Sequence, residues 1–165
     1  MYFVLVVLAH HRRRVVHFNV TEHPTAQWTG QQIIEAFPWD RAPKYLLRDR
    51  DAIYGSEFRR RVESMGTEEV LTAPRSPWQN GIAERWVGSV RRELLDHVVV
   101  LGDRHLRRLL AEYVAYYHDD RPHLGLAKGT PQGRAAAPRP TPDASLMARP
   151  KVGGLHHRYA WKAAA

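Results

Sequence analysis

The alternation of apolar and polar residues divides the first 120 residues into short regular segments. Residues 2–9 form a continuous apolar run rich in Val and Leu, which is typical of a strand buried on both faces. A polar turn follows at 10–13, and charged or polar residues then alternate with apolar ones over 14–20. This pattern predicts a second strand, and the two strands together predict a β-hairpin.

Helical spacing appears next and then alternates with short apolar runs. Trp28, Gln32, Ile33 and Phe37 lie on one face of a helix predicted over 25–37, with Pro38 at its end. The remaining predicted segments are a strand at 44–48, a helix at 56–65, a strand at 69–72, and helices at 82–98 and 103–118. The order β-β-α-β-α-β-α-α predicts an α/β domain in which helices flank a mixed sheet.

Composition and charge divide the chain into a body and a tail. The 165 residues include 44% hydrophobic and 25% charged residues, with a formal net charge of +8. Residues 1–120 carry 17 Lys/Arg and 16 Asp/Glu, whereas 121–165 carry eight Lys/Arg and a single acid, Asp143. We therefore predict a domain over 1–126 and a basic tail over 127–165. The positive charge favours an anionic partner, nucleic acid before membrane.

The tail is rich in Pro, Ala and Gly, and its periodicity is weak. We interpret 127–150 as a mobile linker. The segment 153–159 is unusual for such a tail, and it is a candidate for a terminal strand or for a site that docks on a partner.

The chain has no cysteine, which excludes disulfides and Cys-based zinc fingers and suits a reducing cytoplasm. The apolar run at 1–9 is too short to span a bilayer and lacks a basic segment before it. We therefore predict a cytoplasmic protein, associated with the nucleoid, and no membrane partner.

Glu84 is the first candidate for chemistry. It follows an Asn80-Gly81 turn and lies in the first turn of the helix predicted over 82–98. The apolar stripe of this helix consists of Ile82, Trp86, Val90 and Leu94. On the opposite side, beside Glu84, lie Gly88, Arg91 and Arg92. Such a face suits a phosphate backbone. Taken alone, however, the helix favours the simpler explanation of a solvated face on which Glu84 interacts with the helix dipole.

Asp49 is the second candidate, because it follows the short strand predicted over 44–48. Enzymes built on sheets place metal ligands at the carboxyl ends of strands. Asp51 is the alternative ligand, and the alternation of Arg and Asp in this segment is also compatible with surface ion pairs.

Taken together, these acids and their surroundings resemble the integrase core of DDE transposases. The motif Ser-Pro-x-x-Asn-Gly-x-x-Glu-Arg spans 76–85, and 34 residues separate Glu84 from Asp49. Residues 117–123, Tyr-His-Asp-Asp-Arg-Pro-His, resemble the end of the same core. The resemblance covers residues 2–126. It implies an RNase H-like fold in which Asp49 and Glu84 are the second and third catalytic acids.

The resemblance also implies a function, namely DNA integration or transposition by strand cleavage and joining. Asp49 and Glu84 would bind Mg²⁺ or Mn²⁺ in a site for phosphoryl transfer. The candidates for contact with DNA are Trp78, Asn80, Arg85, Arg91 and Arg92. The implied partners are DNA and either further copies of the chain or a full-length transposase.

The first acid of the family is not found where the resemblance would place it. The family carries this acid on its first strand, yet the first acid of this chain is Glu22, which follows the predicted hairpin. We therefore expect the first strand to lie upstream of Met1, metal binding to be weak, and the chain to be an impaired remnant. The alternatives are a non-catalytic subunit that binds DNA or interferes with intact transposase, and a different RNase H-like nuclease.

Overall fold

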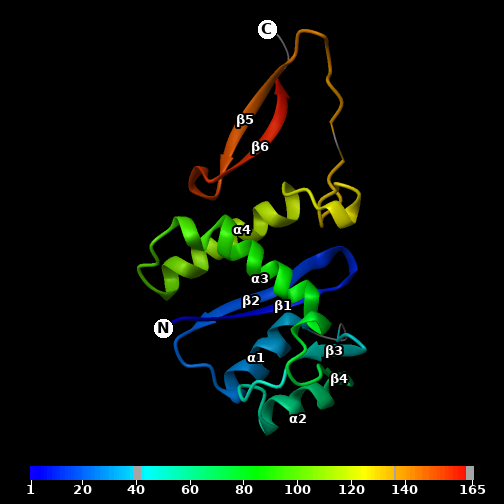
Figure 1. Ribbon diagram of the computed structural model, residues 1–165, viewed down its shortest axis with the longest axis vertical. Helices are drawn as coiled ribbons and strands as arrows, with labels where there is room; N and C mark the ends of the chain where they lie inside the picture. Colours follow the sequence, from blue (N-terminus) through cyan, green and yellow to red (C-terminus); the bar gives the residue numbers. More distant parts are fainter. Residues whose placement is uncertain (39–41, 136, 163–165) are drawn as a thin grey trace. The chain divides into compact units, whose positions relative to one another are not determined.

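The computed structural model describes residues 1–38, 42–135 and 137–162 (Figure 1). Its strands are β1 (Phe3–Ala9), β2 (Arg14–Thr21), β3 (Tyr45–Arg48), β4 (Glu68–Leu71), β5 (Ser145–Lys151) and β6 (His156–Lys162). Its α-helices are α1 (Ala26–Ala36), α2 (Ser56–Ser64), α3 (Gly81–Glu93) and α4 (Asp103–Asp119). Short 3-10 turns lie at His11–Arg13, Pro77–Asn80, Leu95–His97, Leu124–Leu126 and Val152–Gly154. In the described parts of the chain, no helix is long and apolar enough to cross a membrane.

The eight predicted segments are confirmed from β1 to α4. The largest difference is at the end of α3, which stops at Glu93 instead of continuing to 98. A 3-10 turn at Leu95–His97 follows it. The three consecutive valines at 98–100 are β-branched and disfavour a continuation of the helix beyond this turn.

The contacts divide the chain into two compact units. The first contains Met1–His10 and Val15–Gly88, and the second contains His11–Arg14 and Ser89–Ala165. This division follows contacts, whereas the predicted division after residue 126 follows composition.

The first unit is a mixed α/β structure with its core between strands and helices. Its core is built from buried residues of β1, α1 and α2: Leu5, Val7, Ile33, Ala36, Phe58 and Val62. Leu46 of β3 and Trp28 of α1 pack against this cluster. Strands β1 and β2 pair with each other, and β3 pairs with β4. The mixed α/β architecture is as predicted, and within the described residues its strands form two separate pairs.

Helix α1 is held at its start and along its buried face. The Thr25 hydroxyl accepts a hydrogen bond from the Trp28 amide at 3.1 Å, which caps the helix. Gln32 is buried, and its side-chain oxygen accepts a hydrogen bond at 2.7 Å from the side-chain amide nitrogen, Nδ2, of Asn19 in β2. A polar residue is therefore tolerated in this face because β2 satisfies it.

The β3–β4 pair is parallel, and a buried arginine supports it. Arg48 is aligned with Leu71, so both strands end at the same edge. The Arg48 side chain is 9% exposed, donates two hydrogen bonds to Glu69, and donates a third to the Asp49 carbonyl at 2.8 Å. Its guanidinium also lies over the ring of Tyr54, 5.0 Å from the centroid. These contacts fix the chain direction where β3 ends.

The second unit is organised around a half-buried carboxylate, that of Glu93. Glu93 accepts hydrogen bonds from the Tyr113 hydroxyl at 2.8 Å and from Arg121 in a forked pair. Burial raises the pKa of Glu93, but the hydrogen bonds from Arg121 and Tyr113 outweigh burial and lower the pKa below its ordinary value. The last residue of α3 is thereby joined to α4 and to the turn after it.

The Tyr117–His123 motif is accounted for by packing. Tyr117 and His123 are both buried, and their rings meet edge to face at 4.6 Å. The Asp120 carboxylate forms ion pairs with Arg134 and Arg158. In the described chain, the imidazole Nε2 of His123 is buried without a hydrogen-bond partner. The motif therefore holds the end of α4 to the residues that follow it.

The C-terminal residues form a hairpin. Strands β5 and β6 are antiparallel over seven aligned pairs, and the orange-to-red ribbon of Figure 1 shows them as a two-stranded sheet. The terminal strand proposed near 153–159 is present as β6. The linker interpretation of 127–150 is wrong from Ser145 onward, because this segment pairs through its backbone with β6 despite its weak periodicity.

Replacing Arg48 tests the support of the β3–β4 edge. The Arg48→Met variant leaves the Glu69 carboxylate, whose side chain is 16% exposed, without its cation. We expect the free energy of unfolding in urea to fall by about 3 kcal/mol. Arg60→Met is the control, because Arg60 is 75% exposed in its pair with Glu57 and its loss should cost less than about 1 kcal/mol. Equal losses in both variants would contradict this assignment.

Stability should also depend on pH through His123. Burial, and secondarily the charge of Arg121, lowers the pKa of His123 below its ordinary value of 6.5. The unfolded chain therefore binds the extra proton first, so the free energy of unfolding should decrease as the pH falls below about 6.5. In urea titrations between pH 7.5 and 5, His123→Phe should weaken this dependence. His10→Phe, at an exposed position, should leave it unchanged.

Candidate functional site

Asp49 is positioned by the end of β3. It is exposed and follows Arg48 directly, and Arg48 binds its carbonyl oxygen. The parallel register brings the end of β4 to the same edge, where the Thr72 amide donates to the Arg48 carbonyl at 3.0 Å. Arg50 extends this link because its Nε donates to the Thr72 carbonyl at 2.9 Å. The segments that leave the two strands therefore start side by side.

The segment after β4 leads to Glu84 through a compact loop. The Ala73 amide donates to the Gln79 side-chain oxygen at 2.7 Å, and a 3-10 turn spans Pro77–Asn80. Helix α3 then begins at Gly81, which places Glu84 in its first turn. The Glu84 side chain is exposed, whereas Trp86, Val90 and Leu94 of the apolar stripe are buried. The predicted division of this helix into two faces is confirmed at these positions.

Asp49 and Glu84 line the same pocket. Its volume is about 220 Å³. The other lining residues are Arg50, Thr72, Ala73, Pro74, Arg75, Ser76, Pro77 and Asn80. Two carboxylates and two guanidinium groups thus share one small concave surface. The structure brings together two acids that 34 intervening residues separate in the sequence.

Among the described residues that line this pocket, Asp51, the alternative to Asp49, is not found. Its carboxylate accepts a hydrogen bond from the Ile53 amide at 3.0 Å, while the Asp49 carboxylate accepts one from the Asp51 amide at 3.2 Å. Both aspartates therefore shape the turn, and only Asp49 also lines the pocket. Burial, followed by the charges of Asp49 and Asp51, raises the pKa of the nearby Tyr54 to about 12.

Arg75 was not singled out by the sequence. It lies in the pocket lining with a backbone φ of 58°, in the left-handed region that residues other than glycine rarely adopt. Such a conformation costs on the order of 1 kcal/mol and persists where the surrounding structure holds it in place. A lone Arg in a Pro-rich loop has no sequence signal that would have identified it.

The residues predicted to contact DNA occupy different places. Asn80 lines the pocket, and Trp78 in the same turn is 73% exposed. Arg85 is exposed, and its Nε donates to the Gly81 carbonyl within α3. Arg91 and Arg92 are exposed near the end of α3, and neither belongs to the lining of this pocket.

The pocket contains oxygen ligands of the kind that Mg²⁺ prefers, although few of them. Across residues 1–38, 42–135 and 137–162, no group of three or more His, Cys, Asp or Glu side chains is placed to hold a metal ion. Strands β1 and β2 contain no acid. Mg²⁺ commonly binds one or two carboxylates and completes its shell with water and substrate phosphates. The pair Asp49 and Glu84 fits a site of this limited kind.

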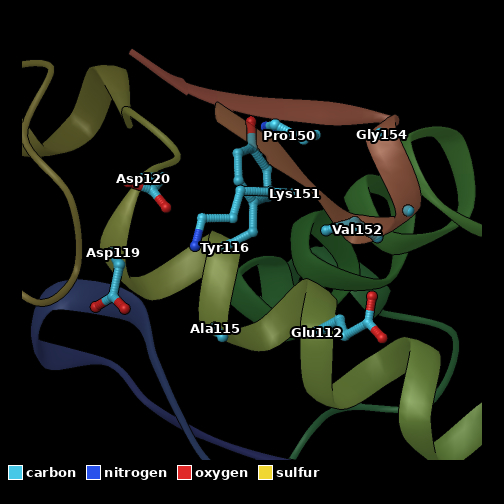
Figure 2. A pocket seen from close by; sticks show the side chains of 10 residues that line it. Glu112, Ala115, Tyr116, Asp119, Asp120, Pro150, Lys151, Val152 and Gly154 are labelled. Carbon is cyan, nitrogen blue, oxygen red and sulfur yellow. The ribbon is translucent and has the colours of Figure 1, made fainter. Parts of the chain in front are cut away.

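A larger pocket of about 530 Å³ lies in the second unit (Figure 2). Helix α4 contributes Glu112, Tyr116 and Asp119, and the hairpin contributes Lys151 and Val152. Figure 2 shows these side chains around the space between helix and hairpin. Neither Asp49 nor Glu84 lines this larger pocket, so the volume of a pocket does not identify the candidate site.

Comparison with known proteins gives three concordant results, of which the first is a family match. Residues 65–131 match the family model described as "Integrase core domain". This segment includes Glu84 and the Tyr117–His123 motif but not Asp49.

Two curated relatives from Escherichia coli are transposases. The putative transposase InsD for insertion element IS2E, from strain K12, is 30% identical over 92 residues, which cover 55% of this chain and 42% of that protein. Transposase InsD for insertion element IS2A/D/F/H/I/K is 30% identical over 92 residues, with coverages of 55% and 31%. The chain thus spans less than half the length of these relatives.

A solved structure shares the fold. It is a chain in the cryoEM structure of the simian T-cell lymphotropic virus intasome in complex with PP2A regulatory subunit B56 gamma. The TM-score is 0.63 and the identity 18%, with 98% of this chain and 61% of that chain covered. This similarity concerns the fold alone. The shared fold is consistent with the predicted RNase H-like class. The family match and the two transposases support the resemblance of this chain to DDE-type integrase cores, and the solved structure supports the fold.

Proposed function

We propose that this chain acts on DNA as part of a transposase or integrase, by metal-dependent cleavage and joining of strands. The observation that carries the proposal is the shared pocket of Asp49 and Glu84. A further support is the similarity to InsD transposases. A bound Mg²⁺ or Mn²⁺ ion would stabilise charge on the reacting phosphate and help to activate the attacking oxygen.

The protein residues have separate tasks in this proposal. Asp49 and Glu84 hold the cation from a strand end and a helix start, two rigid supports. Arg50 and Arg75 line the same pocket and would bind non-bridging phosphate oxygens of the DNA. Asn80 would donate to the sugar-phosphate backbone beside them. Tyr54, whose pKa is about 12, remains protonated at neutral pH and does not serve as a base.

A second candidate function is that of a non-catalytic subunit that binds DNA within a transposase multimer. The observation that favours this function is the small number of metal-binding carboxylates. Among the described residues, only two carboxylates line the pocket, and strands β1 and β2 contain no acid. For the same reason we expect the turnover of the chain alone to be low.

Isosteric replacement of the acids tests the catalytic proposal. On a nicked or blunt DNA duplex with Mg²⁺ or Mn²⁺, Asp49→Asn and Glu84→Gln should each reduce cleavage or joining by roughly 100-fold or more. Asp51→Asn is the matched control and should retain activity, since Asp51 lies outside the pocket lining. All three side chains are exposed, so folding should be unaffected.

The outcomes separate the two candidates. Equal activity of the wild type and Asp49→Asn, or equal loss in Asp51→Asn, would reject the assigned acids. Binding of DNA without any turnover would reject catalysis by this chain and leave the non-catalytic subunit.

The basic end of α3 generates a prediction on binding. Arg91 and Arg92 follow Glu84 by about two helical turns, and we propose that they bind phosphates. Replacing both with Gln should reduce the slope of log K against log salt for duplex DNA by about 1.8, or about 0.9 for each phosphate that is no longer neutralised. Arg60→Gln should leave the slope unchanged, because Glu57 pairs with Arg60 closely at 2.7 Å, whereas Asp96 lies 3.8 Å from Arg91. An unchanged slope in the double variant would exclude both arginines from the DNA interface.

A further inference from the structure

Asn80 and Gly81 form an Asn-Gly pair at the edge of the candidate metal pocket. In such a pair the peptide nitrogen of the glycine can attack the side-chain carbonyl carbon of the asparagine, because glycine has no Cβ to shield that nitrogen. The chain has two asparagines, Asn19 and Asn80, and Val20 follows Asn19. Valine is β-branched and hinders the same attack at Asn19. The labile asparagine of this chain is therefore Asn80, which lines the pocket.

The side chains of the two asparagines are also restrained differently. Asn80 is half-buried, and across residues 1–38, 42–135 and 137–162 its side-chain amide has no hydrogen bond. The Asn19 amide nitrogen donates to Gln32 at 2.7 Å, and its amide oxygen accepts from the Val20 backbone at 2.8 Å. The Asn80 side chain can therefore turn toward the next peptide bond, whereas that of Asn19 is held in place.

The fold does not require a glycine at position 81. The φ of −60° and ψ of −16° of Gly81 are helical values that any residue can adopt. A Cβ built at this position meets the Arg85 guanidinium at 3.7 Å, an ordinary contact distance. Glycine in a helix is less favourable than alanine by about 1 kcal/mol. Gly81→Ala should therefore shield the peptide nitrogen without disturbing the fold.

The turn that contains Asn80 must open for the attack to occur. Asn80 ends the 3-10 turn Pro77–Asn80. In a helical backbone the side chain tilts toward the N-terminal end, away from the peptide nitrogen that follows it. Within the described chain, this four-residue turn has no side-chain cap and no buried residue, so it opens locally at little cost. The reaction should therefore be slower in the folded chain than in the unfolded chain, but not blocked.

We propose that Asn80 deamidates spontaneously and that its new carboxylate joins Asp49 and Glu84 as a third anionic oxygen donor in the pocket. The Gly81 nitrogen loses its proton and bonds to Cγ of Asn80, and the side-chain nitrogen leaves as ammonia. The product is a cyclic imide. Water adds to either carbonyl of the imide and breaks the adjacent C–N bond, which yields aspartate or isoaspartate. One water is consumed and one ammonia is released, without oxidation or reduction.

The new carboxylate would change what the pocket binds. Hard cations such as Mg²⁺ and Mn²⁺ prefer carboxylate oxygens, and the affinity of such sites increases with the number of charged ligands. Arg50 and Arg75 also line the pocket, and their positive charges favour an added carboxylate. This part of the inference rests on the proposed function, in which Asp49 and Glu84 hold the cation.

Peptide mapping by mass spectrometry, during storage of the purified chain at mildly alkaline pH, tests the modification. Residues 76–85 form one tryptic peptide, which should gain the mass of an amide-to-acid exchange and take up oxygen from isotope-labelled water. Asn19 should remain unchanged. Gly81→Ala should slow the conversion of Asn80 by roughly tenfold, because its Cβ shields the peptide nitrogen.

Three results of the peptide map would overturn the proposal. The first is that Asn80 stays intact in the folded chain under conditions in which the urea-unfolded chain converts. The second is conversion of Asn19 at the same rate as Asn80. The third is an unchanged rate in Gly81→Ala.

Titration with Mn²⁺, followed by electron paramagnetic resonance, tests the role of the product. Asn80→Asp should bind Mn²⁺ at least about tenfold more tightly than the freshly purified wild type, because a charged ligand has been added. Gln79→Glu is the matched control. It adds the same charge to the same turn, and Gln79 is not among the described residues that line the pocket. Equal affinity of Asn80→Asp and the wild type, or an equal gain in Gln79→Glu, would overturn the proposal.

Failure of the proposed function would give a different result. If Asp49→Asn and Glu84→Gln leave the Mn²⁺ affinity of the wild type unchanged, the proposed pair of ligands is wrong. The conversion of Asn80 is measured without metal, so the peptide map supports or rejects the modification independently of that pair.

Discussion

The parallel pairing of β3 with β4 is the interaction on which the candidate site depends. Its register ends both strands at one edge, so that Asp49 and Thr72 leave the sheet together. Arg48 holds this arrangement through Glu69 on β4 and through the carbonyl of Asp49. Without that register, the loop from Thr72 would not bring α3 and Glu84 to Asp49. The position of Asp49 therefore depends on the Arg48–Glu69 ion pair, which takes no part in the proposed reaction.

Much of this arrangement could be predicted from the sequence. The apolar periodicities identified the segments from β1 to α4, and the spacing of Asp49 and Glu84 within recognisable motifs indicated that they belong together. The sequence could not decide whether Asp49 or Asp51 is the candidate metal ligand. Both residues follow the same short strand, and only the conformation of the turn determines which of them lines the pocket. The sequence also could not predict the roles of Arg48, Glu69 and Arg75. The ion pair of Arg48 with Glu69 joins residues that are distant in the chain, and the position of Arg75 depends on its backbone conformation.

The Tyr117–His123 motif illustrates a different limit of sequence reasoning. It supports the resemblance to the integrase core, yet its residues serve packing: Tyr117 meets His123 edge to face, Asp120 pairs with two arginines, and Arg121 binds Glu93. Glu93 itself is an ordinary helical residue in the sequence. Likewise, the hairpin in the tail was expected only as a candidate terminal strand, because β5 lacks an apolar pattern and depends on backbone pairing with β6.

The central claim is that Asp49 and Glu84 together bind a divalent cation. Amide NMR spectra recorded during titration with Mn²⁺ test this claim directly, because the paramagnetic ion broadens signals near it. The signals of residues 49–51 and 80–85 should broaden together at substoichiometric Mn²⁺, and either Asp49→Asn or Glu84→Gln should abolish the effect in both segments. Broadening of one segment alone, or broadening that both variants retain, would contradict the claim.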